Sequence, residues 1–339
     1  MGSDNFVIGL DLGTTRCKAV AVSARGEVAA DATSAYPLHS PHPGWAEQAA
    51  GDIWEGARAA LSGLAEKVPA ECITGLALSG AMHSVLLVDE AGEPLAPAPT
   101  WADQRAASQA AALRGQAEAL RGQAEAQALY QRTGCPLVAS YHPAKLRWWL
   151  EEQPALAQRA AHFVSLKDYV LWRLSGRWTT DIGLASTTGL FDIHQFDWDG
   201  EALALAGVTR ERLPDLVRPA EIAGQVTAEA AALTGLRVGL PVAAGSSDGG
   251  TANLGAGAVQ AGQSVVTLGT SGAIRRLVAQ PLLDRAARTW CYVLDEGQWF
   301  AGGAINNAGL AVQWVRERLY PDVAGEAGYA ALMADAAGV

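Results

Sequence analysis

Two short turns rich in glycine and hydroxyl residues are the first candidates for chemistry in this sequence. Leu-Gly-Thr-Thr occupies positions 12–15 and Leu-Gly-Thr-Ser occupies positions 268–271, each between two apolar segments. Both are therefore predicted to be turns between strands, in which the glycine adopts a backbone conformation closed to other residues. Successive N–H groups and two hydroxyls can then bind one anion. A tight hairpin turn explains either copy alone, but two copies favour half-sites that grip a triphosphate across a cleft.

Charged residues flank the first turn. Asp11 directly precedes it and is a candidate for holding a magnesium ion, directly or through water. Lys18 follows the turn and is a candidate for a phosphate contact, although an outward-facing strand residue explains it equally well. Neither GxxxxGK[ST] nor GxGxxG occurs, so a phosphate site of the strand–loop–helix type is not expected.

The composition limits the classes of protein that could use these turns. With 339 residues, half of them hydrophobic and 18% charged, the chain is long enough for two globular domains. The net charge of −10 disfavours a nucleic-acid surface. The four cysteines lack the spacing of a zinc site or a disulfide framework. With no signal peptide or membrane-spanning segment predicted, a cytoplasmic protein with reduced thiols is expected.

Hydrophobic periodicity predicts the elements that must position these residues. Strands are expected at 6–12, 18–23, 27–33, 73–79, 85–88 and 241–245, and a second hairpin is expected around Gly269. Helices are expected at 52–67, 102–132, 144–152, 167–174 and 310–319, and strand and loop at 178–191. Within 102–132 the heptad LRGQAEA occurs twice, at 113–119 and 120–126. Two heptads, each with a glycine, are too few for a coiled coil and favour a solvated helix.

An ordered set of motifs resembles the FGGY carbohydrate kinases along essentially the whole chain. These motifs are DLGTT (11–15), PGWAEQ (43–48), SGAMHS (79–84), TWADQRA (100–106), AKLRWW (144–149), SLKDYVLWRLSG (165–176), ASTTGLFD (185–192), GSSDGG (245–250) and TLGTSGAIR (267–275). AMHS, TWADQR and GLFDI are most similar to gluconate kinases, because xylulose kinases usually carry Gln before the Met-His pair and Gly after it.

The resemblance implies an α/β fold of the duplicated actin/Hsp70-like, ribonuclease-H type, with two domains and a cleft between them. Residues 1–243 would form the sugar-binding domain with the first phosphate turn, and residues 244–339 the start of the second domain. Domains of this family are similar in size, so we expect the second domain to be truncated, lacking roughly 150 residues. For that reason ATP affinity and turnover are expected to be low while sugar binding is retained or modestly weakened. The alternative is a second domain that is naturally abbreviated and folds differently.

The resemblance also implies roles for single residues. Asp248, which follows the apolar segment Pro241–Gly245, matches the catalytic base that receives the proton of a sugar hydroxyl. The alternative for Asp248 is a helix cap. The substrate-binding set is Met82, His83, Trp101, Asp103 and Lys145. The phosphate-binding set is Gly13, Thr14, Thr15, Lys18, Gly269, Thr270, Ser271, Gly302, Gly303 and Asn306, with Asp11 at the metal.

Structural roles without substrate contact remain the alternative for several of these residues. His83 and Trp101 could be structural, and Lys145 and Lys167 could lie on the solvated faces of their helices. A gluconate pocket should contain a cation or oriented N–H donors for the carboxylate. Arg105, Lys145 and Lys167 are the candidates for that cation, and the sequence does not choose among them.

The activity implied is ATP- and Mg²⁺-dependent phosphorylation of a small sugar or sugar acid, with gluconate to 6-phosphogluconate favoured. Xylulose or another polyol is an alternative acceptor. A sugar-binding protein of this fold without turnover is a second hypothesis, and a chaperone ATPase a third, which AMHS and TWADQR disfavour. No nucleic acid or membrane is expected as a partner, and a homodimer is compatible with the family.

Overall fold

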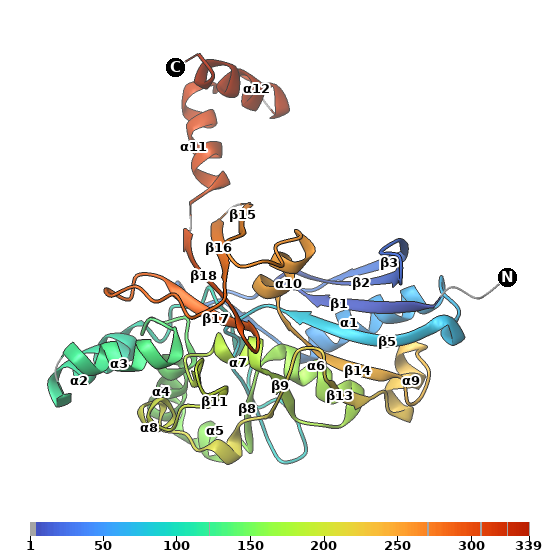
Figure 1. The fold of residues 1–339 in the computed structure, drawn as a ribbon, viewed down its shortest axis with the longest axis horizontal. Helices are drawn as coiled ribbons and strands as arrows, with labels where there is room; N and C mark the ends of the chain where they lie inside the picture. The colour runs from blue at the N-terminus through green and yellow to red at the C-terminus, as the bar shows by residue number, and fades with distance from the viewer. Residues whose placement is uncertain (1–4, 122, 270, 306, 324, 339) are drawn as a thin grey trace.

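The computed structural model describes residues 5–121, 123–269, 271–305, 307–323 and 325–338, with the side chains of 116–126 left aside. Two sheets dominate it, one near each end of the chain, and helical layers cover the first (Figure 1). In the described part of the chain, no helix is both long and apolar enough to cross a membrane.

The first sheet has the strand order β13–β14–β5–β1–β2–β3. An antiparallel meander, β1–β2–β3, continues into the parallel neighbours β5 and β14, and β13 closes the edge antiparallel to β14. Its strands are β1 (Phe6–Leu12), β2 (Arg16–Ser23), β3 (Val28–Ala35), β5 (Ile73–Gly80), β13 (Ile222–Gln225) and β14 (Pro241–Ser247). The meander and the two buried strands predicted from the sequence are thus confirmed.

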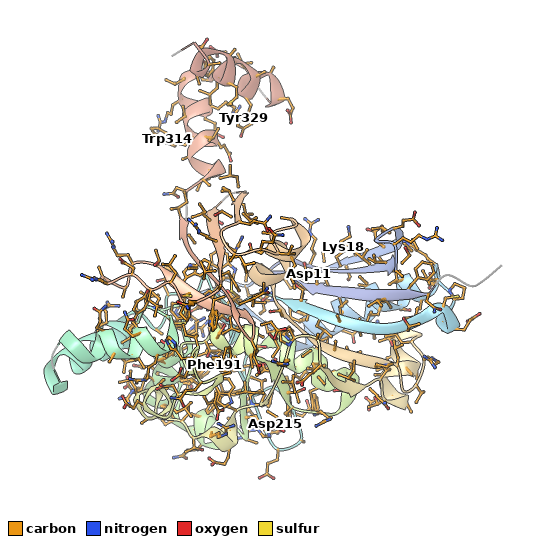
Figure 2. The ribbon with its side chains drawn as sticks, in the orientation of Figure 1. Asp11, Lys18, Phe191, Asp215, Trp314 and Tyr329 are labelled. Carbon is orange, nitrogen blue, oxygen red and sulfur yellow. The ribbon has the colours of Figure 1, made fainter. Side chains whose placement is uncertain are left out.

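The second sheet has the order β15–β16–β18–β17, with all neighbours antiparallel. Its strands are β15 (Ser264–Leu268), β16 (Gly272–Val278), β17 (Trp290–Asp295) and β18 (Gln298–Ile305). The hairpin predicted around Gly269 is β15–β16. Two helices follow, α11 (Gly309–Leu319) and α12 (Gly325–Ala336), and stand away from the rest of the chain. Figure 2 labels Trp314 and Tyr329 on this arm, and Trp314 is exposed.

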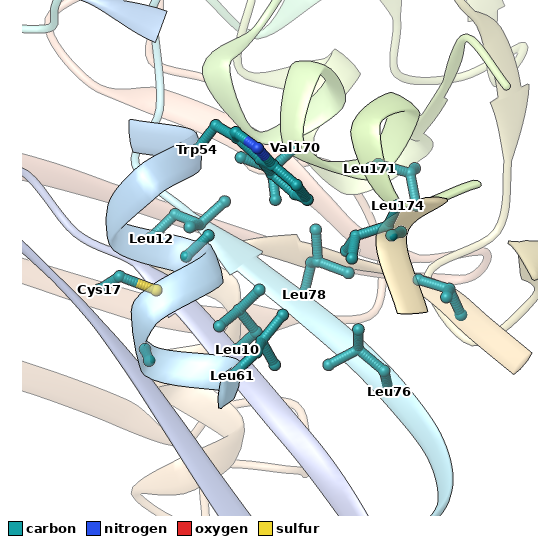
Figure 3. Close-up of a cluster of buried hydrophobic side chains, with 14 of the residues drawn as sticks. Leu10, Leu12, Cys17, Trp54, Leu61, Leu76, Leu78, Val170, Leu171 and Leu174 are labelled. Carbon is teal, nitrogen blue, oxygen red and sulfur yellow. The ribbon is translucent and has the colours of Figure 1, made fainter. Parts of the chain in front are cut away.

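The core of the first sheet forms because alternate strand residues meet amphipathic helices. Leu10 and Leu12 of β1 and Leu78 of β5 are buried. They pack with Trp54 of α1 (Ala50–Ala65) and Leu171 of α6 (Leu166–Ser175), as Figure 3 shows. Helix α9 (Ala228–Thr234) contributes to the same cluster. Burying each such leucine stabilises the fold by about 1.5–3 kcal/mol.

The remaining elements build a second core beside the first sheet. Its helices are α2 (Ala107–Arg121), α3 (Gln123–Thr133), α4 (His142–Glu152), α5 (Pro154–Arg159) and α8 (Gly200–Ala206), with 3₁₀ helices η1 (Ala70–Cys72) and η2 (Arg210–Arg212) elsewhere. Strands β6 (Leu86–Val88) and β8 (His162–Val164) also contribute to it. The other short strands are β4 (Glu47–Gln48), β7 (Ala98–Pro99), β9 (Thr179–Asp181), β10 (Phe191–Asp192), β11 (Asp197–Trp198) and β12 (Asp215–Val217).

Two sequence predictions differ from the structure here. The helix expected at 102–132 begins only at Ala107, because Asp103 and Arg105 form an ion pair in the preceding turn, and its described parts on either side of residue 122 are α2 and α3. Residues 116–126, which carry most of the repeated heptad, have no described side chains, so its solvated face stays a prediction. The segment 178–191 was predicted to be strand and loop, but it contains a helix, α7 (Ile182–Ser186).

Helix α7 forms because its first turn is capped and its surroundings are apolar. The Asp181 carboxylate accepts a hydrogen bond from the N–H of Leu184, which satisfies one of the free donors at the helix start. All five residues of α7 are buried. Tertiary packing therefore overrides the weak helix propensity of a stretch rich in Gly, Ser and Thr.

The end of β14 is shaped by a glycine. Gly245 has a φ of +71°, and a Cβ at this position would lie 1.5 Å from the carbonyl oxygen of Leu78 on β5. The register between β14 and β5 shifts at this point, between Ala243 and Ser246. Since β14 belongs to the first sheet, the predicted domain boundary at 243/244 falls within this strand, and the division into two domains stays a prediction.

Candidate active site

A cleft of about 920 Å³ lies between the first sheet and the hairpin β15–β16. Asp11 and Lys18 line it from β1 and β2, and Arg275 lines it from β16. Asp248, the first residue of helix α10 (Asp248–Gly255), lies between them. Figure 2 shows Asp11 and Lys18 on the strands next to α10. The cleft thus opens where the parallel strands β1, β5 and β14 reach their carboxyl ends, the usual position of a ligand site in such sheets.

Asp248 is a partly buried carboxylate at a helix start. Its Oδ1 accepts a hydrogen bond from the N–H of Gly249 at 2.7 Å, while the helix is capped by Ser247, not by Asp248. Burial raises the pKa of Asp248 to about 6, with a contribution from the negative charge of Asp11. The hydrogen bond from Gly249 and the positive charge of Arg275 lower this pKa and so offset part of the increase. A carboxylate with this pKa can accept a proton near neutral pH.

Hydroxyl groups connect Asp11 to the helix that carries Asp248. The hydroxyl of Ser79 donates to Asp11 Oδ1 at 2.8 Å and lies 2.9 Å from the hydroxyl of Thr251. Sequence reasoning assigned no role to Ser79 or Thr251. The sequence holds no local signal for this contact, because it depends on the parallel register in which Asp11 of β1 and Ser79 of β5 are partners. The network fixes the orientation of the Asp11 carboxylate toward the cleft.

The carboxylates of the cleft fit a magnesium ion that is bound mainly through substrate. Within the described residues, no three His, Cys, Asp or Glu side chains gather as metal ligands. Mg²⁺ in phosphoryl-transfer sites commonly uses one or two carboxylates, several waters and substrate phosphates. Asp11, which lines the cleft, supplies such a carboxylate.

Asp11→Ala is therefore expected to weaken the magnesium dependence of nucleotide use. The variant loses the carboxylate that would hold the water shell of the ion, so a higher magnesium concentration should be needed for half-maximal rate. A magnesium titration of ATP consumption checks this, with Asp215→Ala on β12 as an exposed control. An unchanged titration curve in Asp11→Ala would contradict the role.

Both predicted phosphate turns connect neighbouring antiparallel strands, as expected. Their glycines, however, do not adopt the predicted backbone conformation. Neither Gly13 nor Gly269 has a positive φ. The N–H of each closes its own turn, donating to Arg16 O at 3.1 Å and to Ser271 O at 2.9 Å respectively. At Gly13 a side chain is disfavoured for a steric reason, since a Cβ would lie 3.2 Å from Arg16 O. Binding of an anion would therefore use the other donors of these turns.

The first turn is held by residues of the predicted sugar-side motifs. The carbonyl oxygen of Thr14 accepts a hydrogen bond from the Gln48 side-chain amide at 2.8 Å. The hydroxyl of Thr14 accepts a second one from the indole N–H of Trp101 at 3.1 Å. The Thr15 carbonyl accepts from the backbone N–H of Tyr36. Trp101 is 41% exposed, so the alternative that it belongs to the core is wrong. These bonds connect the turn to the segment that is expected to contact the acceptor.

The other predicted phosphate residues are dispersed. Lys18 pairs with Asp31 at 3.2 Å on the half-exposed face of β2. Gly302 lies in β18 between Arg275 and Trp290 of the neighbouring strands, and Gly303 pairs with Ile274. Thr270 and Asn306 lie outside the described residues.

Met82 and His83 lie beside the cleft and do not line it. Met82, Gly13 and Trp101 share a separate cavity of about 10 Å³, which is room for about one water. The His83 backbone has a φ of +68°, and its Nδ1 lies 2.9 Å from Thr187 O. Burial and the charge of Lys145 lower the pKa of His83 to about 3, so its imidazole is neutral.

The expected carboxylate-binding cations are buried in internal contacts. Arg105 is ion-paired with Asp103 and Glu47 at 2.8 and 2.6 Å, and its guanidinium lies 3.6 Å from the ring centre of Trp45. Asp103 itself is fully buried, with Ala46 N–H donating to it. This cluster holds the TWADQR loop against the PGWAEQ segment.

Lys145 and Lys167 are also inside the protein, so the alternative of solvated helix faces is wrong for both. Lys145 donates to the carbonyls of His83 and Thr100 at 2.6 and 2.7 Å, and burial lowers its pKa to about 7. Lys167 pairs with Asp181 at 2.7 Å and donates to Ala244 O. None of Arg105, Lys145 and Lys167 is among the described residues that line the cleft.

Comparisons with known proteins agree with this geometry. The chain is 34% identical to a gluconokinase of Bacillus subtilis (strain 168) over 313 residues, 92% of this chain and 60% of that protein. A xylulose kinase structure from Rhodospirillum rubrum is similar with a TM-score of 0.92 and 33% identity, covering 99% of this chain and 67% of the other. A gluconate kinase structure from Lactobacillus acidophilus has a TM-score of 0.88 and 29% identity, covering 94% and 63%.

These likenesses confirm the predicted α/β fold of the actin/Hsp70 type. The chain spans about 60% of the length of the gluconokinases it matches. Residues 6–255 match the N-terminal domain of the FGGY family of carbohydrate kinases, and the chain therefore belongs to that family.

Proposed function

We propose that this chain supplies the acceptor-binding part and the catalytic base of an ATP-dependent kinase whose acceptor is gluconate. The observation that carries the proposal is Asp248, a carboxylate with its pKa raised to about 6 that faces Asp11 in the cleft. The likeness to gluconokinases supports gluconate as the acceptor. Likeness to xylulose and glycerol kinases keeps the polyols as the alternative acceptors.

In the proposed reaction the terminal hydroxyl of gluconate attacks the γ-phosphorus of ATP, giving 6-phosphogluconate and ADP. Asp248 orients that hydroxyl and receives its proton as the new O–P bond forms. Asp11 and its hydroxyl network would hold a magnesium ion, which neutralises charge on the phosphate oxygens. Trp101, bonded to Thr14, places the acceptor-side loop against the first turn.

Gluconate is expected to be the preferred acceptor in a panel of gluconate, xylulose, glycerol and ribulose. The measurement is ATP consumption by this chain in a coupled assay, together with calorimetric binding of each acceptor. The Asp248→Asn variant is the control for consumption that does not depend on the site.

The outcomes separate the competing hypotheses. Preference for xylulose or glycerol would contradict the gluconate assignment and leave a sugar kinase of another specificity. Acceptor binding without any ATP consumption would favour a sugar-binding role for the chain, the second hypothesis drawn from the sequence.

A further inference from the structure

Arg275 is a cation of the cleft that the sequence did not single out. It lies on β16, and its side chain lines the cleft together with Asp248 and Thr267. Of the cleft-lining residues in the described chain, only Lys18 is also a cation, and it is ion-paired with Asp31. Arg275 is therefore the cleft cation whose charge is not matched by a salt bridge in the described chain.

The guanidinium of Arg275 is oriented but incompletely bonded. Its Nη1 donates to the hydroxyl of Thr267 on the neighbouring strand at 2.9 Å. Its Nε is buried and has no hydrogen-bond partner among the described residues. A buried N–H without a partner is unfavourable, so an acceptor supplied by a ligand would stabilise this arrangement. The bond to Thr267 fixes the plane in which such an acceptor must lie.

The unbonded Nε lies close to the first turn of helix α10, next to Asp248. A Cβ added at Gly249, the residue after Asp248, would lie 3.2 Å from Nε of Arg275 and 3.2 Å from the terminal methyl of Met82. Arg275 and Met82 therefore both approach the start of α10, in space that a side chain at position 249 would otherwise take. Met82 belongs to the motif expected to contact the acceptor, so Arg275 reaches that same region from the second sheet.

The backbone of Arg275 is also separated from the second turn. It lies three residues beyond Gly272 along β16, which is about 10 Å at the usual rise of a strand. It shares a strand face with Leu277, which packs with Tyr141 and Tyr292 in a fully buried cluster. That face is directed at the first part of the chain, where the acceptor is expected.

We propose that Arg275 binds the carboxylate of the acceptor and so determines the preference for a sugar acid over a neutral polyol. This inference rests on the proposed function. Guanidinium groups bind carboxylates through charge-assisted hydrogen bonds. The three cations that the sequence offered for this role are held in internal contacts, whereas Arg275 has an unbonded donor beside the catalytic carboxylate.

The test compares gluconate with D-glucitol, in which a CH₂OH group replaces the carboxylate. Binding of both is measured by calorimetry, without nucleotide, for the wild type, Arg275→Met and Arg275→Lys. The matched control is Arg276→Met, because Arg276 is the next residue of β16, is exposed, and points to the opposite face of the sheet.

We expect Arg275→Met to weaken gluconate binding about 10- to 100-fold, the usual range for losing a hydrogen bond to a charged group. Glucitol binding should stay within twofold of wild type, which also shows that the variant is folded. Arg275→Lys should recover part of the gluconate affinity, since it restores the charge without the planar fork. Arg276→Met should bind both ligands as the wild type does.

Four results would overturn the assignment. Unchanged gluconate affinity in Arg275→Met would do so while leaving the proposed function intact, as would an equal loss for gluconate and glucitol. Unchanged binding with slower turnover on every acceptor would place Arg275 at the transferred phosphoryl group instead. A wild-type chain that binds xylulose or glycerol but not gluconate would overturn the proposed acceptor together with this assignment.

Discussion

Asp248→Asn is expected to slow phosphoryl transfer by ~10²–10⁴-fold while leaving acceptor binding close to that of the wild type. The amide keeps the shape of the side chain but cannot take up the proton of the acceptor hydroxyl. Coupled turnover and acceptor calorimetry on the same samples check both halves of the expectation. Asp215→Asn is the control, since Asp215 is an exposed aspartate far from the cleft in Figure 2. A variant that keeps more than about a tenth of the activity would remove Asp248 from the role of base.

The pH dependence gives an independent test of the same residue. With a pKa of about 6, Asp248 is ionised above that pH and protonated below it, so the wild-type rate should fall as pH falls through 6. The same shift has a consequence for stability. The folded protein binds this proton more tightly than the unfolded chain, so the free energy of unfolding falls as pH rises from 3.8, the ordinary pKa of an aspartate, to about 6, and this group causes no further change above that pH. Asp248→Asn should therefore be at least as stable as the wild type at pH 8, and reduced stability there would contradict this account.

Lys167→Met is expected to destabilise the protein by about 3–5 kcal/mol, because it leaves Asp181 as an uncompensated charge in the interior. The Lys167 and Asp181 side chains are both fully buried, 2.7 Å apart. The ammonium also donates to Ala244 O, so it connects α6, the start of α7 and strand β14. Denaturant unfolding measures the loss. Lys18→Met is the matched control, because its ion pair with Asp31 is half-exposed and should be worth less than about 1 kcal/mol.

A second variant keeps this test informative if Lys167→Met does not fold. Lys167→Met combined with Asp181→Asn removes both charges, keeps a side-chain acceptor for the Leu184 N–H, and should recover much of the stability because no charge is left unpaired in the interior. Recovery would assign the damage to the unpaired carboxylate. A loss below about 1 kcal/mol in the single variant would mean that Lys167 is not a structural cation.

The sequence predicted the elements whose signal is local. The meander β1–β2–β3 and strands β5 and β14 follow from short apolar segments, and helix α1 follows from the spacing of residues such as Trp54 and Leu61. The position of Asp248 at a strand end followed from the same reasoning. Helix α7 was missed because burial and the cap from Asp181 form it, not the propensity of its own residues.

What the sequence could not predict depends on contacts between distant residues. Lys167 is typical of a solvated helix residue until Asp181 and Ala244 are placed beside it. Lys145 is similar, because its partners are the carbonyls of His83 and Thr100. Arg275 reads from sequence as an ordinary strand residue, and its position over Gly249 appears only when the second sheet is packed against the first.

The strand order of the first sheet has a consequence for how the chain folds during synthesis. Strand β14 pairs with β5 but begins roughly 160 residues after β5 ends. At the usual 5–20 residues per second, β5 waits on the order of 10–30 s for that neighbour. Throughout this interval the edge of β5 that will later pair with β14 has unpaired backbone N–H and C=O groups beside Leu76 and Leu78. An exposed strand edge of this kind can pair with a wrong strand. Nascent-chain misassembly should therefore start at β5, in the interval before β14 emerges from the ribosome.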